Sequence, residues 1–280
     1  MMQKISIKKQ FGELWASKKA LAIPVTYLIL FFSLIIIVSL TYSLAVARIS
    51  AKGSSLKTSV AKQNMLILDD AVYSVAWSFG ASKVVYMEDC GCLFQTQVTA
   101  KNLLLNLTDE TSFFSIIFNS PLGKAFYRLE ASEYSFANPF IKGDNRVIVN
   151  ASGSGMAQLF VETGEESREL AVCYRPSATV AVVGTSNGKP LNLIRVYVLN
   201  LNSSQNLQLR ESFYLKVTAV NVTTITYQYD FNQSLSHLSL KAVFDGKSGV
   251  VKLPVESNAQ GASVNLELVI CNIKLQKAEV

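Results

Sequence analysis

The N-terminal part of the chain carries an unbroken stretch of hydrophobic residues. No ionisable side chain other than tyrosine falls within residues 20–47. A helix needs roughly 20 apolar residues to cross a bilayer, whereas the apolar part of a cleaved secretory signal has only about 7–15. The pattern therefore predicts a transmembrane helix over residues 21–47. Pro24 suits its first turn, where the missing N–H removes no helical hydrogen bond.

Beyond Arg48 the apolar residues thin to a helical spacing that continues to Phe79. The residues that recur on one side of this expected helix are Leu56, Val60, Ile67, Ala71 and Val75. This periodicity predicts that the helix continues outside the membrane over residues 48–80. Residues 53–55 (GSS) predict a kink or short linker in it, and Gly80 is the expected C-terminal cap.

After Gly80 the hydrophobic period changes from that of a helix to that of a strand. Apolar and polar side chains alternate over residues 224–231, which is typical of a strand with one buried face. Residues 213–219 alternate in the same way until the phase blurs near Asn221, which predicts a bulge or a turn. Residues 191–201 are apolar on both faces, which predicts a central strand.

Turn residues separate these runs, and they favour a β fold over a helical one. Turns are expected at residues 119–123, 142–145, 186–188, 245–249 and 258–261. The expected fold class is α+β, with a long N-terminal transmembrane helix and a mainly antiparallel β-sandwich-like extracellular region over residues 81–280. This region should be soluble without the helix. It divides into two modules near residues 150–169 or forms a single interleaved sandwich.

The charges are distributed unevenly along the chain. Residues 1–62 contain nine basic side chains and one acidic one, and the remaining residues contain 17 basic and 19 acidic side chains. Lysines next to an apolar span interact with anionic headgroups, whereas nucleic-acid binding needs a basic face on the folded domain. We therefore expect residues 1–20 to be a cytoplasmic basic tail or leader of a single-pass cell-membrane protein, and we expect no nucleic-acid partner.

The four cysteines all follow the expected span, in what should be an oxidising compartment. Two disulfides are therefore expected among Cys90, Cys92, Cys173 and Cys271. Cys90 and Cys92 flank a single glycine and would be strained if paired with each other, so each is expected to pair with Cys173 or Cys271 in either order. The alternative is that the cysteines are buried free thiols.

Five Asn-x-Ser/Thr sequons also lie on the expected external side. They begin at Asn106, Asn150, Asn202, Asn221 and Asn232. Such motifs also arise by chance in a chain rich in Asn, Ser and Thr. We expect only some of the five to carry glycan.

The sequence lacks the residue motifs of common enzyme active sites. His237 is the only histidine, and neither a Gly-x-Ser-x-Gly elbow nor a phosphate-binding glycine loop occurs. The acidic pairs Asp69–Asp70 and Glu88–Asp89 are interpreted as solvated faces or turns. We therefore expect no enzymatic activity, no catalytic or metal-binding residues and no cofactor.

One short segment resembles a known family. Residues 17–25 (SKKALAIPV) resemble the class III signal peptides of archaeal type IV pilins and pilin-like proteins, in which a basic and a small residue precede an apolar helix that opens with Pro-Val. The resemblance covers about thirty residues and implies cleavage by a prepilin peptidase between Ala20 and Leu21. The proline lies one residue later than in the commoner archaeal pattern.

The resemblance implies a function without chemistry. The chain would be a pilin-like subunit of an archaeal cell-surface filament or secretion pseudopilus, working by self-assembly and surface adhesion. Its partners would be the lipid bilayer, copies of itself or other pilin-like subunits, the prepilin peptidase and the assembly machinery. The alternative is a non-assembling single-pass anchored surface protein whose β-sandwich serves as a binding or adhesion module.

Overall fold

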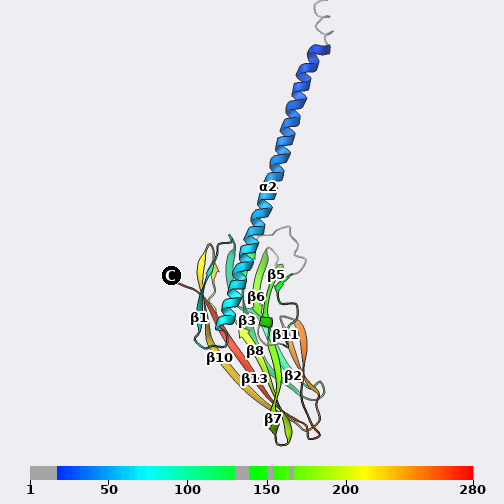
Figure 1. Ribbon diagram of the computed structural model, residues 1–280, viewed down its shortest axis with the longest axis vertical. Coiled ribbons are helices and arrows are strands. Elements are labelled where there is room, and N and C mark those ends of the chain that lie inside the picture. The colour runs from blue at the N-terminus through cyan, green and yellow to red at the C-terminus, as the bar shows by residue number, and fades with distance from the viewer. Residues whose placement is uncertain (1–17, 130–138, 151–153, 164–166, 280) are drawn as a thin grey trace, which may run out of the picture. The chain divides into compact units, whose positions relative to one another are not determined.

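The structure, a computed structural model, describes residues 18–129, 139–150, 154–163 and 167–279 (Figure 1). The chain divides into two compact units, Met1–Ser55 and Leu56–Val280. The described part of the first unit is the beginning of helix α2 (Lys18–Val75). The second unit contains the rest of α2 and the described strands.

Helix α2 is continuous over 58 residues and runs through residues 53–55 without a break. The short linker predicted as one alternative is therefore wrong, although the two units divide at this place. The helix ends at Val75, earlier than expected, and Trp77 takes the left-handed conformation (φ 67°) in the turn that follows. Gly80 is not the cap. It lies in the following turn, where its N–H donates to the Ala219 carbonyl over 2.8 Å.

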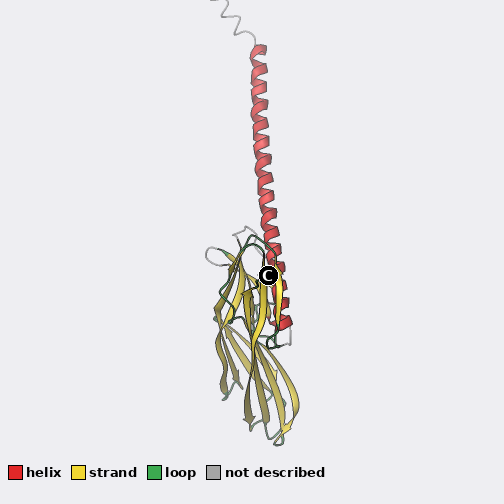
Figure 2. Cartoon of the chain, turned by 90° about the vertical axis from the view of Figure 1, so that its left-hand side faces the viewer, coloured by secondary structure: helices red, strands yellow, loops and turns green. Residues whose placement is uncertain are grey.

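The described strands form two sheets (Figure 2), and among them every strand pair except β13 with β8 is antiparallel. The first sheet has the order β1 (Ser82–Met87), β10 (Phe213–Phe231), β13 (Ala262–Lys277), β8 (Lys189–Asn200) and β7 (Ser177–Ser186), with β13 and β8 parallel. The second has the order β12 (Lys247–Pro254), β11 (His237–Phe244), β2 (Leu93–Thr108), β3 (Phe114–Leu129), β6 (Arg168–Tyr174), β5 (Ala157–Thr163) and β4 (Phe140–Lys142), and β9 (Gln208–Leu209) pairs with β2. Both sheets are curled, and a 3-10 helix, η1 (Ser154–Met156), precedes β5. The expected α+β class with a mainly antiparallel β region is confirmed.

Several local strand predictions are also confirmed. The alternating residues 224–231 lie in β10, and the register of β10 against β13 shifts between Ala219 and Asn221, at the predicted bulge. Strand β8 is central, between β13 and β7. Residues 119–123 were expected to turn but lie within β3.

Two of the predicted turns are tight hairpins for which the sequence supplies the required residues. Asn187 and Gly188 between β7 and β8, and Asp245 and Gly246 between β11 and β12, all have positive φ angles of 51–77°. Asn, Asp and Gly tolerate this conformation, and Asn-Gly and Asp-Gly are the preferred pairs of two-residue hairpins.

The β region is not divided near residues 150–169. Strand β6 pairs with β3 and β5, and β11, late in the chain, pairs with β2, so segments before and after this place share one sheet. Residues Leu56–Val280 accordingly form one compact unit. The domain therefore begins within the helix and not at residue 81.

Two core clusters explain where the domain begins. The first contains the α2 residues Ala61, Met65, Leu68, Ala71, Val72 and Val75, the following Ala76, and buried residues from strands of both sheets. The second contains buried residues from strands of both sheets and none from α2. The C-terminal part of α2 is thus a core element of the β domain, which is why its apolar residues recur at helical spacing.

Candidate functional site

The N-terminal part of α2 exposes large hydrophobic side chains around its whole circumference. From Val25 to Ile49 the exposed fractions of these side chains range from 44% to 72%. Within the described residues, α2 is the one helix long and apolar enough to cross a membrane, by length and composition. A helix that is apolar all round needs a non-aqueous environment, which is either lipid or the interior of a protein assembly.

Two hydroxyl side chains in this stretch satisfy their hydrogen bonds within the helix. Ser33 Oγ donates to the Leu30 carbonyl over 2.8 Å, and Thr41 Oγ1 donates to the Ile37 carbonyl over 2.7 Å. In hydrocarbon an unpaired hydroxyl costs several kcal/mol. The stretch can therefore enter an apolar environment without leaving these two hydroxyls unpaired.

A buried carboxylate ties α2 to the second sheet. Asp69 is fully buried; Lys142 Nζ of β4 donates to its Oδ2 over 2.5 Å, and Tyr174 OH of β6 donates to its Oδ1 over 3.0 Å. Lys142 Nζ also lies 5.5 Å from the ring centroid of Tyr73, whose hydroxyl accepts a hydrogen bond from the Ala157 N–H. The helix is thus held by an ion pair and two tyrosines besides its apolar contacts.

Burial dominates the electrostatics of this cluster. It raises the pKa of Asp69, although the hydrogen bond and charge of Lys142 and the hydrogen bond of Tyr174 act in the opposite direction. Burial, followed by the charge of Asp69, raises the pKa of Tyr73 to about 12 and that of Tyr174 well above its usual value. Both hydroxyls therefore stay protonated at neutral pH.

The sequence interpretation of Asp69 as part of a solvated acidic pair is wrong. Its neighbour Asp70 is exposed, but Asp69 lies four residues after Met65 and three before Val72, both fully buried. Residues at these spacings share one helix face. The sequence signal was therefore a carboxylate on the apolar face of the helix.

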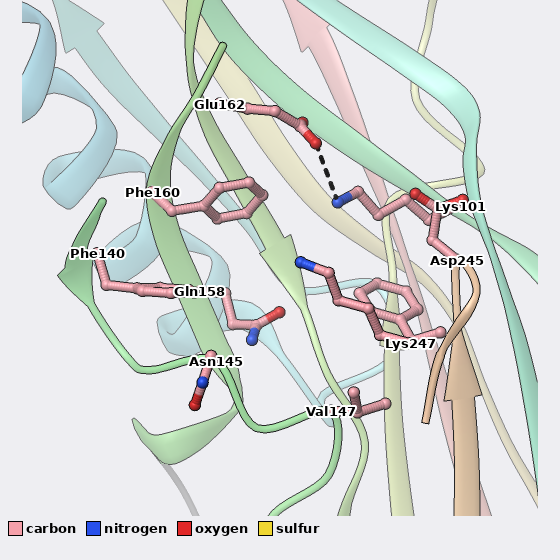
Figure 3. A pocket seen from close by; sticks show the side chains of 10 residues that line it. Lys101, Phe140, Asn145, Val147, Gln158, Phe160, Glu162, Asp245 and Lys247 are labelled. Carbon is pink, nitrogen blue, oxygen red and sulfur yellow. Dashed lines mark ion pairs between the residues drawn. The ribbon is translucent and has the colours of Figure 1, made fainter. Parts of the chain in front are cut away.

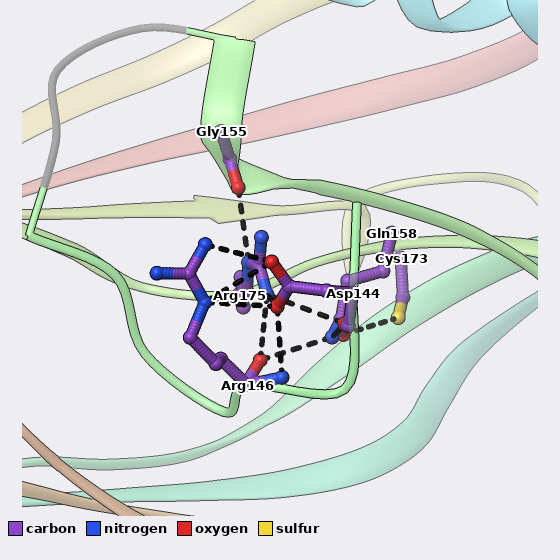
Figure 4. A network of polar contacts seen from close by, with 6 residues as sticks. All are labelled: Asp144, Arg146, Gly155, Gln158, Cys173 and Arg175. Carbon is purple, nitrogen blue, oxygen red and sulfur yellow. Dashed lines mark hydrogen bonds and ion pairs between the residues drawn. The ribbon is translucent and has the colours of Figure 1, made fainter. Parts of the chain in front are cut away.

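A second polar network centres on Arg175, which is 2% exposed (Figure 4). Arg175 Nη1 donates to Asp144 Oδ1 over 2.5 Å and to the Arg146 carbonyl over 2.8 Å, and Nε donates to the Gly155 carbonyl over 2.9 Å. Gln158 Nε2 donates to the carbonyls of Asp144 and Arg146. Hydrogen bonds from Arg146 and then Arg175 hold the pKa of Asp144 well below its usual range. The network anchors the segment after β4 to the start of β5.

Replacing Arg175 by methionine should loosen this segment and destabilise the domain by on the order of 3 kcal/mol, because buried carbonyls lose a charged donor. Arg146→Met is the matched control, since Arg146 pairs with the same Asp144 but its side chain is 66% exposed. An exposed ion pair contributes at most about 1 kcal/mol. Urea unfolding of both variants checks the prediction, and equal effects would contradict it.

A small cavity of about 100 Å³ lies next to this network (Figure 3). Lys101 Nζ lies 3.8 Å from Glu162 Oε1, 4.9 Å from the ring centroid of Phe160 and 5.7 Å from that of Phe244. Lys247 also lines the cavity, whereas no Ser, Thr, Cys or His side chain does. The cavity offers charged and aromatic contacts to a group of a few atoms.

The expected disulfides are absent, and all four cysteines are free thiols. Cys90, Cys173 and Cys271 are buried and Cys92 is half-buried. Cys173 belongs to the second core cluster, where its thiol donates to Gln158 Oε1 over 3.7 Å, and Cys271 belongs to the first. Neither is bonded to Cys90 or Cys92, although Cys90 lies in the same cluster as Cys271. Each core cysteine is packed as a small apolar side chain.

The predicted glycosylation sites differ in accessibility. Asn150, Asn221 and Asn232 are exposed and Asn202 is half-buried. Asn106 lies in β2 with 9% of its surface exposed, and its Oδ1 has no hydrogen-bond partner among the described residues. In the folded domain, Asn106 is therefore inaccessible to a glycosyltransferase.

The remaining predicted positions fall partly outside the described residues. Ala20 and Leu21, the expected cleavage pair, lie in the first turn of α2, and residues 1–17 lie outside the described part of the chain. His237 Nδ1 lies 3.0 Å from Ser236 Oγ, in a contact between chain neighbours. The described residues contain no group of three His, Cys, Asp or Glu side chains that could hold a metal ion.

The function of the chain has to be argued from its own residues. They provide an apolar helical surface in the first unit, and an anchored helix and a small polar cavity in the second. In comparisons with known proteins, no family model, no curated protein and no solved structure matches the chain.

Proposed function

We propose that this chain is a pilin-like, membrane-inserted subunit of an archaeal cell-surface filament or secretion pseudopilus, acting by self-assembly and surface adhesion. The observation that carries the proposal is that one helix, α2, serves two environments. Residues 25–49 expose hydrophobic side chains all round, and residues 61–76 are part of the core of the β domain. A subunit of this plan joins its folded domain through one helix to the apolar segment that would assemble.

In the bilayer, the apolar segment would be a single span with the basic tail on the cytoplasmic side and the β domain outside. Its small residues are scattered and form no Gly-x-x-x-Gly face, so isolated spans should pair only weakly in lipid. In a filament, many copies would bury the same Leu, Ile and Phe side chains away from water. This burial would stabilise the assembly by about 25 cal/mol per Å² of apolar surface. Assembly would thus depend on the number of neighbours and not on one strong helix pair.

The proposed processing and assembly steps follow from the resemblance at residues 17–25. A prepilin peptidase would cut between Ala20 and Leu21, and the assembly machinery would then extract the helix from lipid. The β domain, a curled β-sandwich-like module on the outer side, would supply the surface-binding function, with glycan on exposed sequons. The second candidate, a permanently anchored surface protein, would keep its basic tail.

Ala20→Asp should block processing and therefore filament assembly, while leaving the apolar span intact. Ala20→Ser is the matched control because it keeps a small residue at the expected cleavage position. We expect filaments from the serine variant, and accumulation of uncut protein in the membrane for the aspartate variant. Immunoblots of membrane and sheared surface fractions measure both. Full surface assembly of the aspartate variant would exclude the pilin-like function and favour the permanent anchor.

A further inference from the structure

A short loop places two of the four free thiols together. Residues 90–92 (CGC) connect β1 to β2, and the chain bends at Gly91 and Cys92. The Cys92 thiol donates to the Cys90 carbonyl over 3.4 Å. Cys90 is 4% exposed, whereas Cys92 is half-buried. The Cys92 side chain is thus partly open to solvent, whereas that of Cys90 is nearly closed to it.

The bend takes the chain between the two cysteines out of the extended conformation, in which they could not pair. Residues two apart in an extended chain have Cα atoms about 7 Å apart, which exceeds the 5.5–6 Å that disulfides commonly span. Gly91 has a φ of 65°, and its N–H donates to Asp89 Oδ1 over 2.7 Å. A Cβ at Gly91 would also lie 3.3 Å from Lys57 Cε. The left-handed backbone at this turn therefore favours glycine.

The loop is fixed to the helix by one buried amide. Asn64 of α2, 2% exposed, accepts a hydrogen bond from the Glu88 N–H at Oδ1 over 3.1 Å. Its Nδ2 donates to the Glu88 carbonyl over 2.8 Å and to Tyr127 OH over 3.1 Å. Both backbone groups of Glu88 are thus held, and the chain enters the cysteine loop from a fixed point.

We propose that Cys90 and Cys92 are a redox modification site that forms a reversible disulfide within the loop by exchange with a low-molecular-weight disulfide. The Cys92 thiolate attacks one sulfur of the external disulfide, forming a mixed disulfide and releasing a thiolate that takes up the Cys92 proton. The Cys90 thiolate then attacks the Cys92 sulfur and expels the second thiolate, which takes up the Cys90 proton. Two protein thiols are oxidised, and one external disulfide is reduced to two thiols.

The order of attack rests on exposure, since Cys92 is half-buried and Cys90 is 4% exposed. The thiol pKa values separate Cys90 from the two core cysteines. The hydrogen bond from Cys92 lowers the pKa of Cys90, whereas burial raises the pKa of Cys173 to about 11 and also raises that of Cys271. Thiolates, and not thiols, attack disulfides. At neutral pH the loop cysteines should therefore react, and the two core cysteines should remain reduced.

The test uses the full chain in detergent, exposed to oxidised glutathione and then alkylated, digested and mapped by mass spectrometry. We expect the peptide with residues 90–92 to lose two hydrogen atoms and to escape alkylation, and dithiothreitol should reverse the change. Cys173 and Cys271 should be alkylated only after unfolding. Persistent alkylation of Cys90 and Cys92, or cross-links from them to Cys173 or Cys271, would overturn the proposal.

Two variants separate the steps. Cys90→Ser should retain glutathione on Cys92, because the resolving thiol is missing. Cys92→Ser should gain no adduct, because Cys90 is nearly inaccessible. Cys173→Ala is the control and should form the loop disulfide to the same extent as the wild type. A stable glutathione adduct on Cys92 in the wild type would show that Cys90 cannot resolve it and would also overturn the proposal.

Discussion

A polypeptide of residues 56–280 should fold as a soluble β-rich domain, whereas one of residues 81–280 should aggregate. The shorter polypeptide lacks Met65, Leu68, Val72 and Val75, which are at most 2% exposed. Burying four side chains of this size contributes about 6–12 kcal/mol, compared with a total stability of about 5–15 kcal/mol for a domain. Removing them should therefore cancel most of the stability and expose strands of both sheets.

Circular dichroism and urea unfolding of the two polypeptides make the comparison directly. Adding a peptide of residues 56–80 to the shorter polypeptide serves as the control and should restore cooperative unfolding in proportion to its concentration. If the 81–280 polypeptide folds cooperatively with the same unfolding free energy as 56–280, then α2 is not part of the core that the domain needs to fold.

Asp69→Ala should destabilise the domain by about 3–5 kcal/mol, because Lys142 and the Tyr174 hydroxyl would lose a fully buried partner. The matched control is Asp70→Ala at the exposed neighbouring position, which should change the free energy of unfolding by less than about 0.5 kcal/mol. The double variant Asp69→Leu with Lys142→Met should recover much of the loss, since it removes both charges. Similar effects of the two alanine variants in urea unfolding would contradict the role given to Asp69.

The raised pKa of Asp69 predicts how the stability of the domain changes with pH. Burial raises the pKa of Asp69 in the folded protein above the value of about 3.9 in an unfolded chain. The folded state therefore binds this proton more tightly, and titration of Asp69 lowers stability as the pH rises from about 3.9 through the raised pKa. The unfolding free energy of the wild type minus that of Asp69→Asn should therefore decrease as the pH rises through this range.

Hydrophobic periodicity predicted the elements of this fold well where each element was long and regular. The apolar run before Ala47 and the helical spacing after it predicted α2, and the alternation over residues 224–231 predicted part of β10. Asn-Gly and Asp-Gly predicted two hairpins because few residues tolerate the required backbone conformation.

Other features depend on contacts between distant segments. Residues 119–123 contain Pro121 and Gly123, which resemble a turn, yet β2 pairs along this part of β3. The placement of α2 between strands of both sheets also follows from tertiary packing, so a domain boundary at residue 81 was the natural expectation from the change of period. The bend at Gly91, on which the proposed loop disulfide depends, is a property of backbone geometry that spacing alone does not reveal.

The mass of the N-terminal peptide, measured in filaments sheared from native cells, tests the central claim most directly. The proposed function predicts that the chain is present in this fraction and begins at Leu21, without residues 1–20. A chain that is absent from the filaments and keeps residues 1–20 in the membrane fraction would contradict assembly and leave a permanently anchored surface protein.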